Sequence, residues 1–426
     1  MVLTNSKKYL KRAKNVIPGL SQTFSKAPYS YVEGTYPVFI KKGNGCKLTD
    51  VDDNEFIDYV LALGPVSLGY CYKKVDNAIK QQLEKGISFS MPHYLEVEFS
   101  EKLQKIIPNA EMVRFSKTGS DAVTACLRVA RAYTQKDHIL YCGHGGVWHD
   151  WFTTITSRNQ GIPKFNSKLI SLFQYNNLES VKKLFKTYHN KVAAVIMEPM
   201  WLDFPNESFL HELKELAHKN NALFIFDEVL TGFRLANGGG QELLKIDADL
   251  AAFGKAIGNG MPLGAITGKE EYMKEFNDVF YSTTYAGEAL SLAAGNAVVD
   301  EYLNKPVIKH CWKMGQLLKD NFNKISSELK LNAKWNGLPV RGSIEFLNEK
   351  GNDKNSLKSL FLQECIKNNI LFGQGEALLS YSHKIKDIKS TITTFEKALQ
   401  TVSDAIQKNN VSEKLEGKEI KSVMTF

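Results

Sequence analysis

A lysine and an aspartate stand at the ends of two apolar segments of the chain. Asp227 ends the segment ALFIFD, and Lys255 follows the segment DLAAFG. A buried amine that loses its proton easily attacks carbonyl carbons, and lysines that form Schiff bases use this property. An ion pair, or an aspartate that caps a turn, would explain either residue alone. The pair therefore needs further partners before it indicates chemistry.

The segments that must position these residues alternate between strand-like and helix-like patterns. Apolar runs at 138–142, 192–197, 222–226, 250–253 and 263–267 predict buried strands. Residues 120–134 have the apolar spacing of a helix that begins after Gly119. This alternation is typical of an α/β fold, in which ligands bind at the carboxyl ends of the strands. We therefore expect Asp227 and Lys255 to lie at one edge of a mostly parallel sheet.

The two ends of the chain differ from its middle. Residues 45–60 alternate like a hairpin, and the C-terminal part carries lysine-rich amphipathic helices such as SLKSLFLQECIKNN. We predict a large domain over 61–304 and a small α+β domain built from 1–60 and 305–426.

Pyridoxal phosphate has the carbonyl that a Schiff-base lysine would use. It also needs a cradle for its phosphate, a carboxylate at its pyridine nitrogen and a flat surface for its ring. Gly119 and Ser120 open the predicted helix, whose first N–H groups suit a phosphate. Asp227 can keep the pyridine nitrogen protonated. Trp148 can cover one face of the ring, and Val229 can cover the other.

A series of segments carries a resemblance to a known family. In chain order they read DVDDNEFIDYVLALGPVSLGY, SFSMPHYLEVEFSEKL, MVRFSKTGSDAVTACLRVARAYT, AAVIMEP, FDEVLTGFR, FGKAIGNGMPLGAITG and YSTTYAGEALSLAAG. They resemble the class III aminotransferases of fold type I, and most of all the glutamate-1-semialdehyde 2,1-aminomutase branch. The resemblance implies a large pyridoxal-phosphate-binding domain with a mostly parallel central sheet flanked by helices.

The resemblance also implies roles for single residues. It makes Lys255 the Schiff-base lysine, Asp227 the partner of the pyridinium nitrogen, and Gly119 with Ser120 the phosphate cradle. Thr284 matches a threonine that reaches the phosphate from the neighbouring subunit, which implies a homodimer with shared active sites. Glu198 of the MEP motif matches an acidic position near the cofactor.

The chain departs from the family pattern at several positions. Trp148, His149 and Asp150 replace the usual aromatic-His-Gly motif, so the ring-covering residue is larger. Glu288 and Ala289 stand where asparagine and proline are common.

Two departures concern the substrate. Lys26 stands where the aminomutase has an arginine for the substrate carboxylate, and a lysine lacks the bidentate fork of arginine. Lys26 could also be merely exposed. Glu376 falls near an acidic position that the aminomutase uses close to its substrate, and it could equally be a surface turn residue.

Composition restricts the partners that we expect. The chain has 54 basic and 46 acidic residues, a net charge of +8, but its lysines are interleaved with acidic residues, which argues against a nucleic-acid partner. Its apolar runs are far shorter than the roughly 20 residues of a membrane span. Its 6 cysteines are scattered and include no CxxC pair, which favours reduced thiols in the cytoplasm. No cluster offers a full set of metal ligands, so no metal is expected.

The sequence leaves the reaction open between alternatives. The first is an aminotransferase that moves an amino group from a donor to a small or sugar-derived aldehyde or ketone, through an aldimine with Lys255 and pyridoxamine phosphate. The second is an aminomutase, an isomerase in which both halves of the transfer occur on one molecule. The third is a non-catalytic binding subunit with the same fold. Lys255 and Asp227 argue against the third, and Lys26 and Trp148 favour the first.

Overall fold

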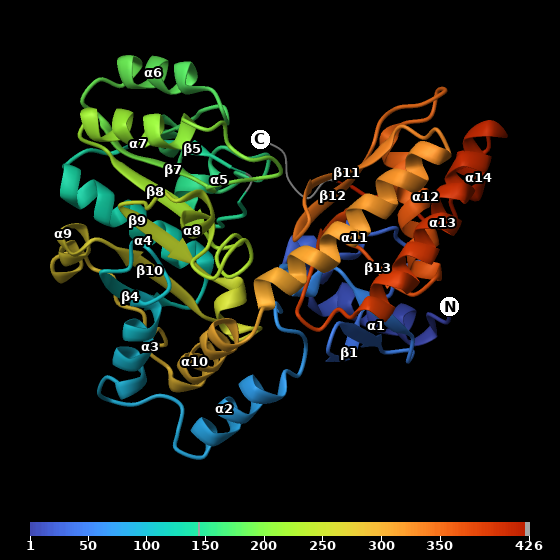
Figure 1. Ribbon diagram of the computed structural model, residues 1–426, viewed down its shortest axis with the longest axis horizontal. Helices are drawn as coiled ribbons and strands as arrows, with labels where there is room; N and C mark the ends of the chain where they lie inside the picture. Colours follow the sequence, from blue (N-terminus) through green and yellow to red (C-terminus); the bar gives the residue numbers. More distant parts are fainter. Residues whose placement is uncertain (144, 422–426) are drawn as a thin grey trace. The chain divides into compact units, whose positions relative to one another are not determined.

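The computed structural model describes residues 1–143 and 145–421 of the 426-residue chain (Figure 1). These residues group into two compact units. The smaller unit contains Met1–Tyr72 and the described residues from Lys309 onward, and the larger unit contains Lys73–Ile308. The domain boundaries that the sequence suggests stay a prediction.

A seven-stranded sheet in the order β4-β10-β9-β8-β7-β5-β6 forms the centre of the larger unit. Its strands are β4 (Met112–Ser116), β5 (His138–Cys142), β6 (Ile170–Leu172), β7 (Val192–Met197), β8 (Leu223–Glu228), β9 (Leu250–Phe253) and β10 (Gly264–Gly268). The pairs from β9 to β6 are parallel, whereas β10 is antiparallel to both β9 and β4. The prediction of a mostly parallel sheet is therefore confirmed.

The central strands are buried along their whole length. Every residue of β7, β8 and β9 is buried, which explains why their sequences are apolar without alternation. The strand predicted over 222–226 continues to Glu228, because β8 pairs Asp227 with Ala252 and Glu228 with Phe253 of β9. Two carboxylates are thus carried to the end of a buried strand.

Helices connect the strands and pack on the sheet. They are α2 (Lys73–Leu83), α3 (Tyr94–Gln104), α4 (Gly119–Thr134), α5 (Asp150–Thr153), α6 (Leu178–Thr187), α7 (Phe209–Lys219), α8 (Gly240–Leu244), α9 (Glu270–Met273) and α10 (Ala289–Asn304). α4 packs against β7, β9 and β10, and its Val123 and Cys126 belong to one buried cluster with Ile225. This packing fixes where the first turn of α4 lies relative to the strand ends.

The smaller unit joins both ends of the chain in one sheet. β1 (Ile40–Asn44), β2 (Lys47–Asp50) and β3 (Glu55–Asp58) form an antiparallel meander, and β13 (Ile370–Leu371) pairs in parallel with β3. A second sheet contains β11 (Ala333–Leu338), β12 (Arg341–Phe346) and β14 (Glu376–Leu378). The helices are α1 (Thr4–Val16), α11 (Val307–Glu328), which starts in the larger unit, α12 (Lys354–Lys367), α13 (Ile385–Gln407) and α14 (Val411–Lys414).

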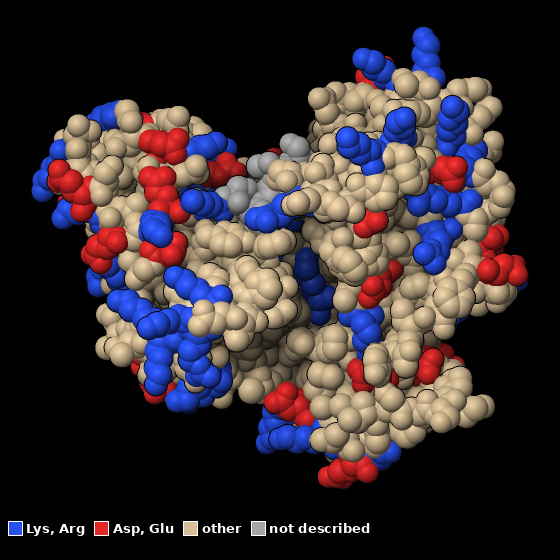
Figure 2. All heavy atoms as spheres, turned by 180° about the vertical axis from the view of Figure 1, so that it is seen from behind, with Lys and Arg blue, Asp and Glu red and all other residues tan. Residues whose placement is uncertain are grey.

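Short 3₁₀ helices complete the chain. They are η1 (Pro18–Leu20), η2 (Phe24–Lys26), η3 (Pro28–Ser30), η4 (Leu61–Leu63), η5 (Lys164–Leu169), η6 (Lys255–Gly258) and η7 (Lys274–Asn277). Among the described helices, none is long and apolar enough to cross a membrane. Lysine and arginine side chains are spread over the face drawn in Figure 2, with acidic side chains among them.

Candidate functional site

Segments from different strands meet at the carboxyl edge of the large sheet. A Cβ atom built on Gly119, the first residue of α4, would lie 2.4 Å from Val229 Cγ1. A Cβ atom on Gly254, which follows β9, would lie 3.3 Å from the same methyl carbon and 3.4 Å from Gly119 Cα. The mouth of α4, the turn after β8 and the turn after β9 are therefore in contact.

Asp227 lies at this edge and is almost fully buried, with 5% of its surface exposed. Its Oδ1 accepts a hydrogen bond of 3.0 Å from the backbone N–H of Val229. Its Oδ2 faces Gly145, where an added Cβ atom would lie 3.2 Å away. A glycine at position 145 therefore leaves space beside this oxygen.

Lys255 begins η6 directly after the buried Gly254. Its φ angle is +45°, in the left-handed region that residues with a side chain rarely adopt. Such a conformation costs about 1–3 kcal/mol and persists only where the surrounding structure imposes it. Gly254, directly before Lys255, lies against Val229 and Gly119. The Lys255 side chain thus leaves a turn at the sheet edge that is next to the mouth of α4.

The first turn of α4 is suited to an anion. The Thr118 side chain accepts a hydrogen bond from the Asp121 N–H, and the Asp121 side chain accepts one from the Thr118 N–H. Within the described part of the chain, no such partner is found for the N–H groups of Gly119 and Ser120. These groups stand at the positive end of a 16-residue helix and are partly exposed.

Trp148 and His149 lie beside the same turn. The Trp148 N–H donates to Ser120 Oγ at 3.4 Å, and its indole is 71% exposed. His149 Nδ1 lies 2.6 Å from Thr124 Oγ1, and its Nε2 lies 3.5 Å from Asp121 Oδ1. Burial lowers the pKa of His149, so its ring favours the neutral form. The two residues are therefore attached to the mouth of α4.

Glu198 is buried, and its charge acts on the phenol of Tyr141, as does the charge of Asp227. Burial raises the pKa of the Tyr141 phenol, and the charges of Glu198 and Asp227 raise it further. The Tyr141 hydroxyl accepts a hydrogen bond of 3.1 Å from the N–H of Gly145. Tyr141 thus holds the segment that faces Asp227. This tyrosine has no signal in the sequence, because it lies inside an apolar strand with no local motif.

Thr284 lies elsewhere in the larger unit. It is exposed and lines a cleft of about 660 Å³ together with residues 88–93. Gly119, Asp227 and Lys255 are not among the described residues that line this cleft. Within one chain, Thr284 and the α4 mouth thus line different spaces.

Lys26 and Glu376, the two predicted substrate residues, belong to the smaller unit. Lys26 lines a mainly apolar cavity of about 630 Å³ beside Asp58. Burial raises the pKa of Asp58 to about 6, although hydrogen bonds and the charge of Lys26 lower it. Glu376 is exposed on β14.

Glu228 is a buried carboxylate that the sequence analysis missed. It accepts hydrogen bonds of 2.9 Å from the N–H groups of Gly240 and Gln241, and another from the Thr231 hydroxyl. A Cβ atom on Gly239 would lie 2.5 Å from its Oε2. The run of glycines at 238–240 was the signal for this close approach. Glu228 therefore fixes the loop between β8 and α8.

Comparisons with known proteins agree on one family. A family model described as Aminotransferase class-III matches residues 29–362. A glutamate-1-semialdehyde 2,1-aminomutase of Acetivibrio thermocellus is 36% identical over 420 residues, which cover 92% of this chain and 97% of the relative. A 3-aminobutyryl-CoA aminotransferase of Cloacimonas acidaminovorans is 31% identical over 409 residues, which cover 94% and 98%. The PLP internal aldimine form of the FumI protein of Sphingopyxis sp. MTA144 has the same fold, with a TM-score of 0.89, 24% identity, and coverage of 95% of this chain and 98% of that one.

The buried position of Glu228 predicts a pH-dependent stability. Burial raises the pKa of Glu228 to about 7, although the hydrogen bonds that it accepts act to lower this pKa. Between the unfolded value of 4.5 and about 7, the folded chain holds a proton that the unfolded chain has released. The free energy of unfolding should therefore fall, relative to that of Glu228→Gln, as the pH rises through this range. Urea denaturation at several pH values between about 5 and 8 measures the difference.

Glu242→Gln is the matched control, because it changes an exposed carboxylate of α8 that accepts a hydrogen bond from Gly238 of the same loop. Its free energy of unfolding, plotted against pH, should run parallel to that of the unchanged protein. If the Glu228→Gln curve were also parallel, Glu228 would not bind a proton in the folded state over this range.

Proposed function

Because this chain belongs to the class-III aminotransferase family, whose enzymes depend on pyridoxal phosphate, we propose that it moves an amino group from a donor to a small or sugar-derived aldehyde or ketone. One observation carries the proposal: the turn that bears Lys255 and the turn after Asp227 both contact the mouth of α4. An amine, a buried carboxylate and an anion site are three of the features that this cofactor requires of a protein.

The residues present fit pyridoxal phosphate. The absence of a side chain at Gly119 lets the mouth of α4 lie against Val229. The N–H groups of Gly119 and Ser120 would bind the phosphate there, and Ser120 adds a hydroxyl. The Asp227 carboxylate would pair with the pyridine nitrogen. Val229 and Trp148 would cover the two faces of the ring.

His149 and Glu198 would support this site from its border. His149 binds α4 through Thr124, and the charge of Glu198 acts on Tyr141, which holds the segment facing Asp227. When bound, the cofactor supplies an aldehyde that bonds to amines and a ring that accepts the electron pair released at the substrate α-carbon.

The protein would control two protons during the reaction. The Lys255 amine would take the proton from the α-carbon of the donor and return it to the cofactor carbon that carried the aldehyde. The Asp227 carboxylate would keep the proton on the pyridine nitrogen. A carboxylate that is buried and oriented by the Val229 N–H is suited to this task, since water does not compete for it.

The aminomutase reaction is the second candidate. It is favoured by 36% identity to a glutamate-1-semialdehyde 2,1-aminomutase over 92% of the chain. Lys26 favours an aminotransferase instead, because it would hold a substrate carboxylate as a point charge rather than as a bidentate partner. A non-catalytic subunit would have no use for an amine and a buried carboxylate whose turns both meet the mouth of α4.

The role of Lys255 can be tested by absorbance. The protein supplied with pyridoxal phosphate should show a visible band that is lost in Lys255→Ala, and the half-reaction of this variant should slow by about 10²–10⁴-fold, the usual value of a general base. Lys245→Ala is the control, because Lys245 also has a positive φ angle but ends α8 at an exposed position. Full activity of Lys255→Ala would refute the scheme.

The same spectrum distinguishes the two reactions. An aminotransferase should convert the cofactor when glutamate or alanine is added alone and release one equivalent of keto acid. An aminomutase should leave the band unchanged with these donors. The first result supports the proposal, and the second favours the alternative.

We also propose that the enzyme is a homodimer with shared active sites. Large apolar side chains are exposed near the cleft that Thr284 lines, at Ile87, Phe89, Met91, Tyr94, Val97 and Tyr285. Exposed apolar patches of this kind mark protein interfaces. A second copy that covers this patch would bring Thr284 to the phosphate of its partner.

Mixed dimers test the shared site. Lys255→Ala and Thr284→Asp should each be inactive alone, the second because a carboxylate would repel the phosphate. Co-expression should restore about a quarter of the native activity, since half of the dimers are mixed and each has one intact site. If Thr284 acted within its own subunit, every site would carry a defect and no activity would return.

A further inference from the structure

One face of α12 is polar, although its middle is buried. Ser356, Ser359, Gln363 and Lys367 recur at helical spacing, and Ser359 and Gln363 have no exposed surface. Buried polar groups require partners. The partners come from residues 414–421, which we call the C-terminal strap.

The strap is hydrogen-bonded along this face of α12. The Ile420 N–H donates to Ser359 Oγ at 3.1 Å. The Ser356 hydroxyl donates to Glu419, and Lys367 forms an ion pair of 2.5 Å with Glu416. The strap therefore runs antiparallel to the helix.

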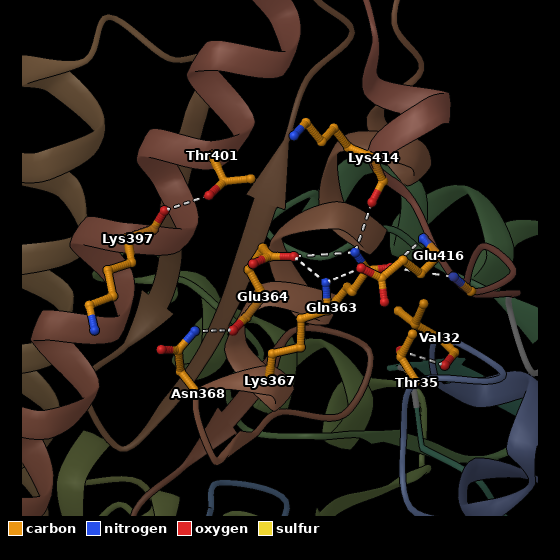
Figure 3. A network of polar contacts seen from close by, with 11 residues as sticks. Val32, Thr35, Gln363, Glu364, Lys367, Asn368, Lys397, Thr401, Lys414 and Glu416 are labelled. Carbon is orange, nitrogen blue, oxygen red and sulfur yellow. Dashed lines mark hydrogen bonds and ion pairs between the residues drawn. The ribbon is translucent and has the colours of Figure 1, made fainter. Parts of the chain in front are cut away.

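Gln363 is the central contact of this arrangement (Figure 3). Its Oε1 accepts hydrogen bonds from the N–H groups of Glu416, at 2.7 Å, and Gly417, at 3.3 Å. Its Nε2 donates to the Lys414 carbonyl at 2.9 Å and to Glu364 at 3.2 Å. The side-chain amide thus acts as a peptide group to which the strap backbone is bonded.

The opposite edge of the strap holds the segment 29–35 near the N-terminus. The Lys418 N–H donates to the Glu33 carbonyl at 2.9 Å, and the Lys421 N–H donates to the Tyr29 carbonyl at 3.2 Å. A Cβ atom on Gly417 would lie 2.7 Å from Val32 Cγ1 and 2.8 Å from the Glu33 carbonyl oxygen. The two backbones are therefore in close contact.

The same segment is hydrogen-bonded to the turn that carries Lys26. The Ser30 hydroxyl donates to the Phe24 carbonyl at 2.8 Å, and the Ser30 N–H donates to the Ala27 carbonyl at 2.9 Å, so η2 and η3 form one folded piece. Lys26 and Tyr31 of this piece line the 630 Å³ cavity of the smaller unit. A shift of segment 29–35 would move Lys26 and open the cavity wall.

We propose that Gln363 is a positioning residue for substrate binding: it docks the C-terminal strap, and the strap holds the segment that carries Lys26. The link to substrate rests on the proposed function, because it assumes that Lys26 binds the substrate carboxylate. The hold of the strap on segment 29–35 does not depend on that assumption.

Hydrogen exchange with the pyridoxal-phosphate-loaded protein tests the proposal. Gln363→Met keeps the length of the side chain but removes the partners of three strap groups, so amides in both the strap and residues 27–35 should exchange at least about tenfold faster. Gln400→Met is the control, because Gln400 is exposed on α13 and its side chain, among the described residues, bonds to Asp404 of the same helix. Gly417→Ala displaces the strap without altering α12 and should reproduce the effect if Gln363→Met folds poorly.

Donor saturation is measured on the same proteins, with whichever of glutamate and alanine converts the cofactor. The half-saturating donor concentration should rise at least about fivefold in Gln363→Met. The limiting rate and the cofactor absorbance should stay unchanged.

Each result has a distinct meaning. Faster exchange confined to the strap would overturn the positioning role of Gln363. Faster exchange over 27–35 with unchanged saturation would overturn its link to substrate binding and the assignment of Lys26. If neither donor converted the cofactor in the unchanged protein, the proposed aminotransferase would fail, and the exchange data would still decide whether the strap holds the segment.

Discussion

The close approach of Gly119, Val229 and Gly254 is the contact on which the site depends. Both Cγ atoms of Val229 lie where a side chain on Gly119 would begin, so the first turn of α4 can touch the turn after β8 only if residue 119 has no side chain. Gly254 meets the same two residues from β9. Because α4 is packed on β7, β9 and β10, the packing of the core determines where the first turn of α4 lies relative to the strand ends. Lys255 follows Gly254 directly, so the turn that bears it starts at this contact.

The two carboxylates that end β8 have different roles. Consecutive residues of a strand point to opposite faces, so Asp227 and Glu228 enter different surroundings. Glu228 is buried among N–H donors of the loop that leads to α8. The hydrogen bonds from these donors offset the free-energy cost of burying its carboxylate. Asp227 is oriented by the Val229 N–H and faces Gly145. One carboxylate fixes the loop, and the other is presented to the proposed cofactor site.

Much of this arrangement could be predicted from the sequence, and the reasons differ from element to element. Continuous apolar runs predicted the buried strands, and the family resemblance, the fold type I architecture, the enzyme class and the pyridoxal phosphate cofactor are confirmed. The roles of Lys255 and Asp227 stay predictions, although the turns that carry them both meet the α4 mouth. Tyr141 escaped notice because the charges next to it, Glu198 and Asp227, come from the ends of other strands, and Glu228 because the glycines at 238–240 were not connected with it. The antiparallel direction of β10 is also a property of pairing, which apolar periodicity does not encode. The strap on α12 could not be foreseen, because the polar residues SxxSxxxQ read as a solvent-facing stripe until the C-terminal segment covers them.

The most direct test of this account is a double-mutant cycle between Gly119 and Val229, read as the affinity for pyridoxal phosphate. Gly119→Ala should weaken binding at least about tenfold, because the added methyl group displaces the α4 mouth from the strand ends. Val229→Ala removes the two methyl groups that the new side chain would meet, so the double variant should recover part of the loss, with a coupling of at least about 1 kcal/mol. An unchanged affinity in Gly119→Ala, or a loss of the same size with and without Val229, would contradict the claim that this contact builds the cofactor site.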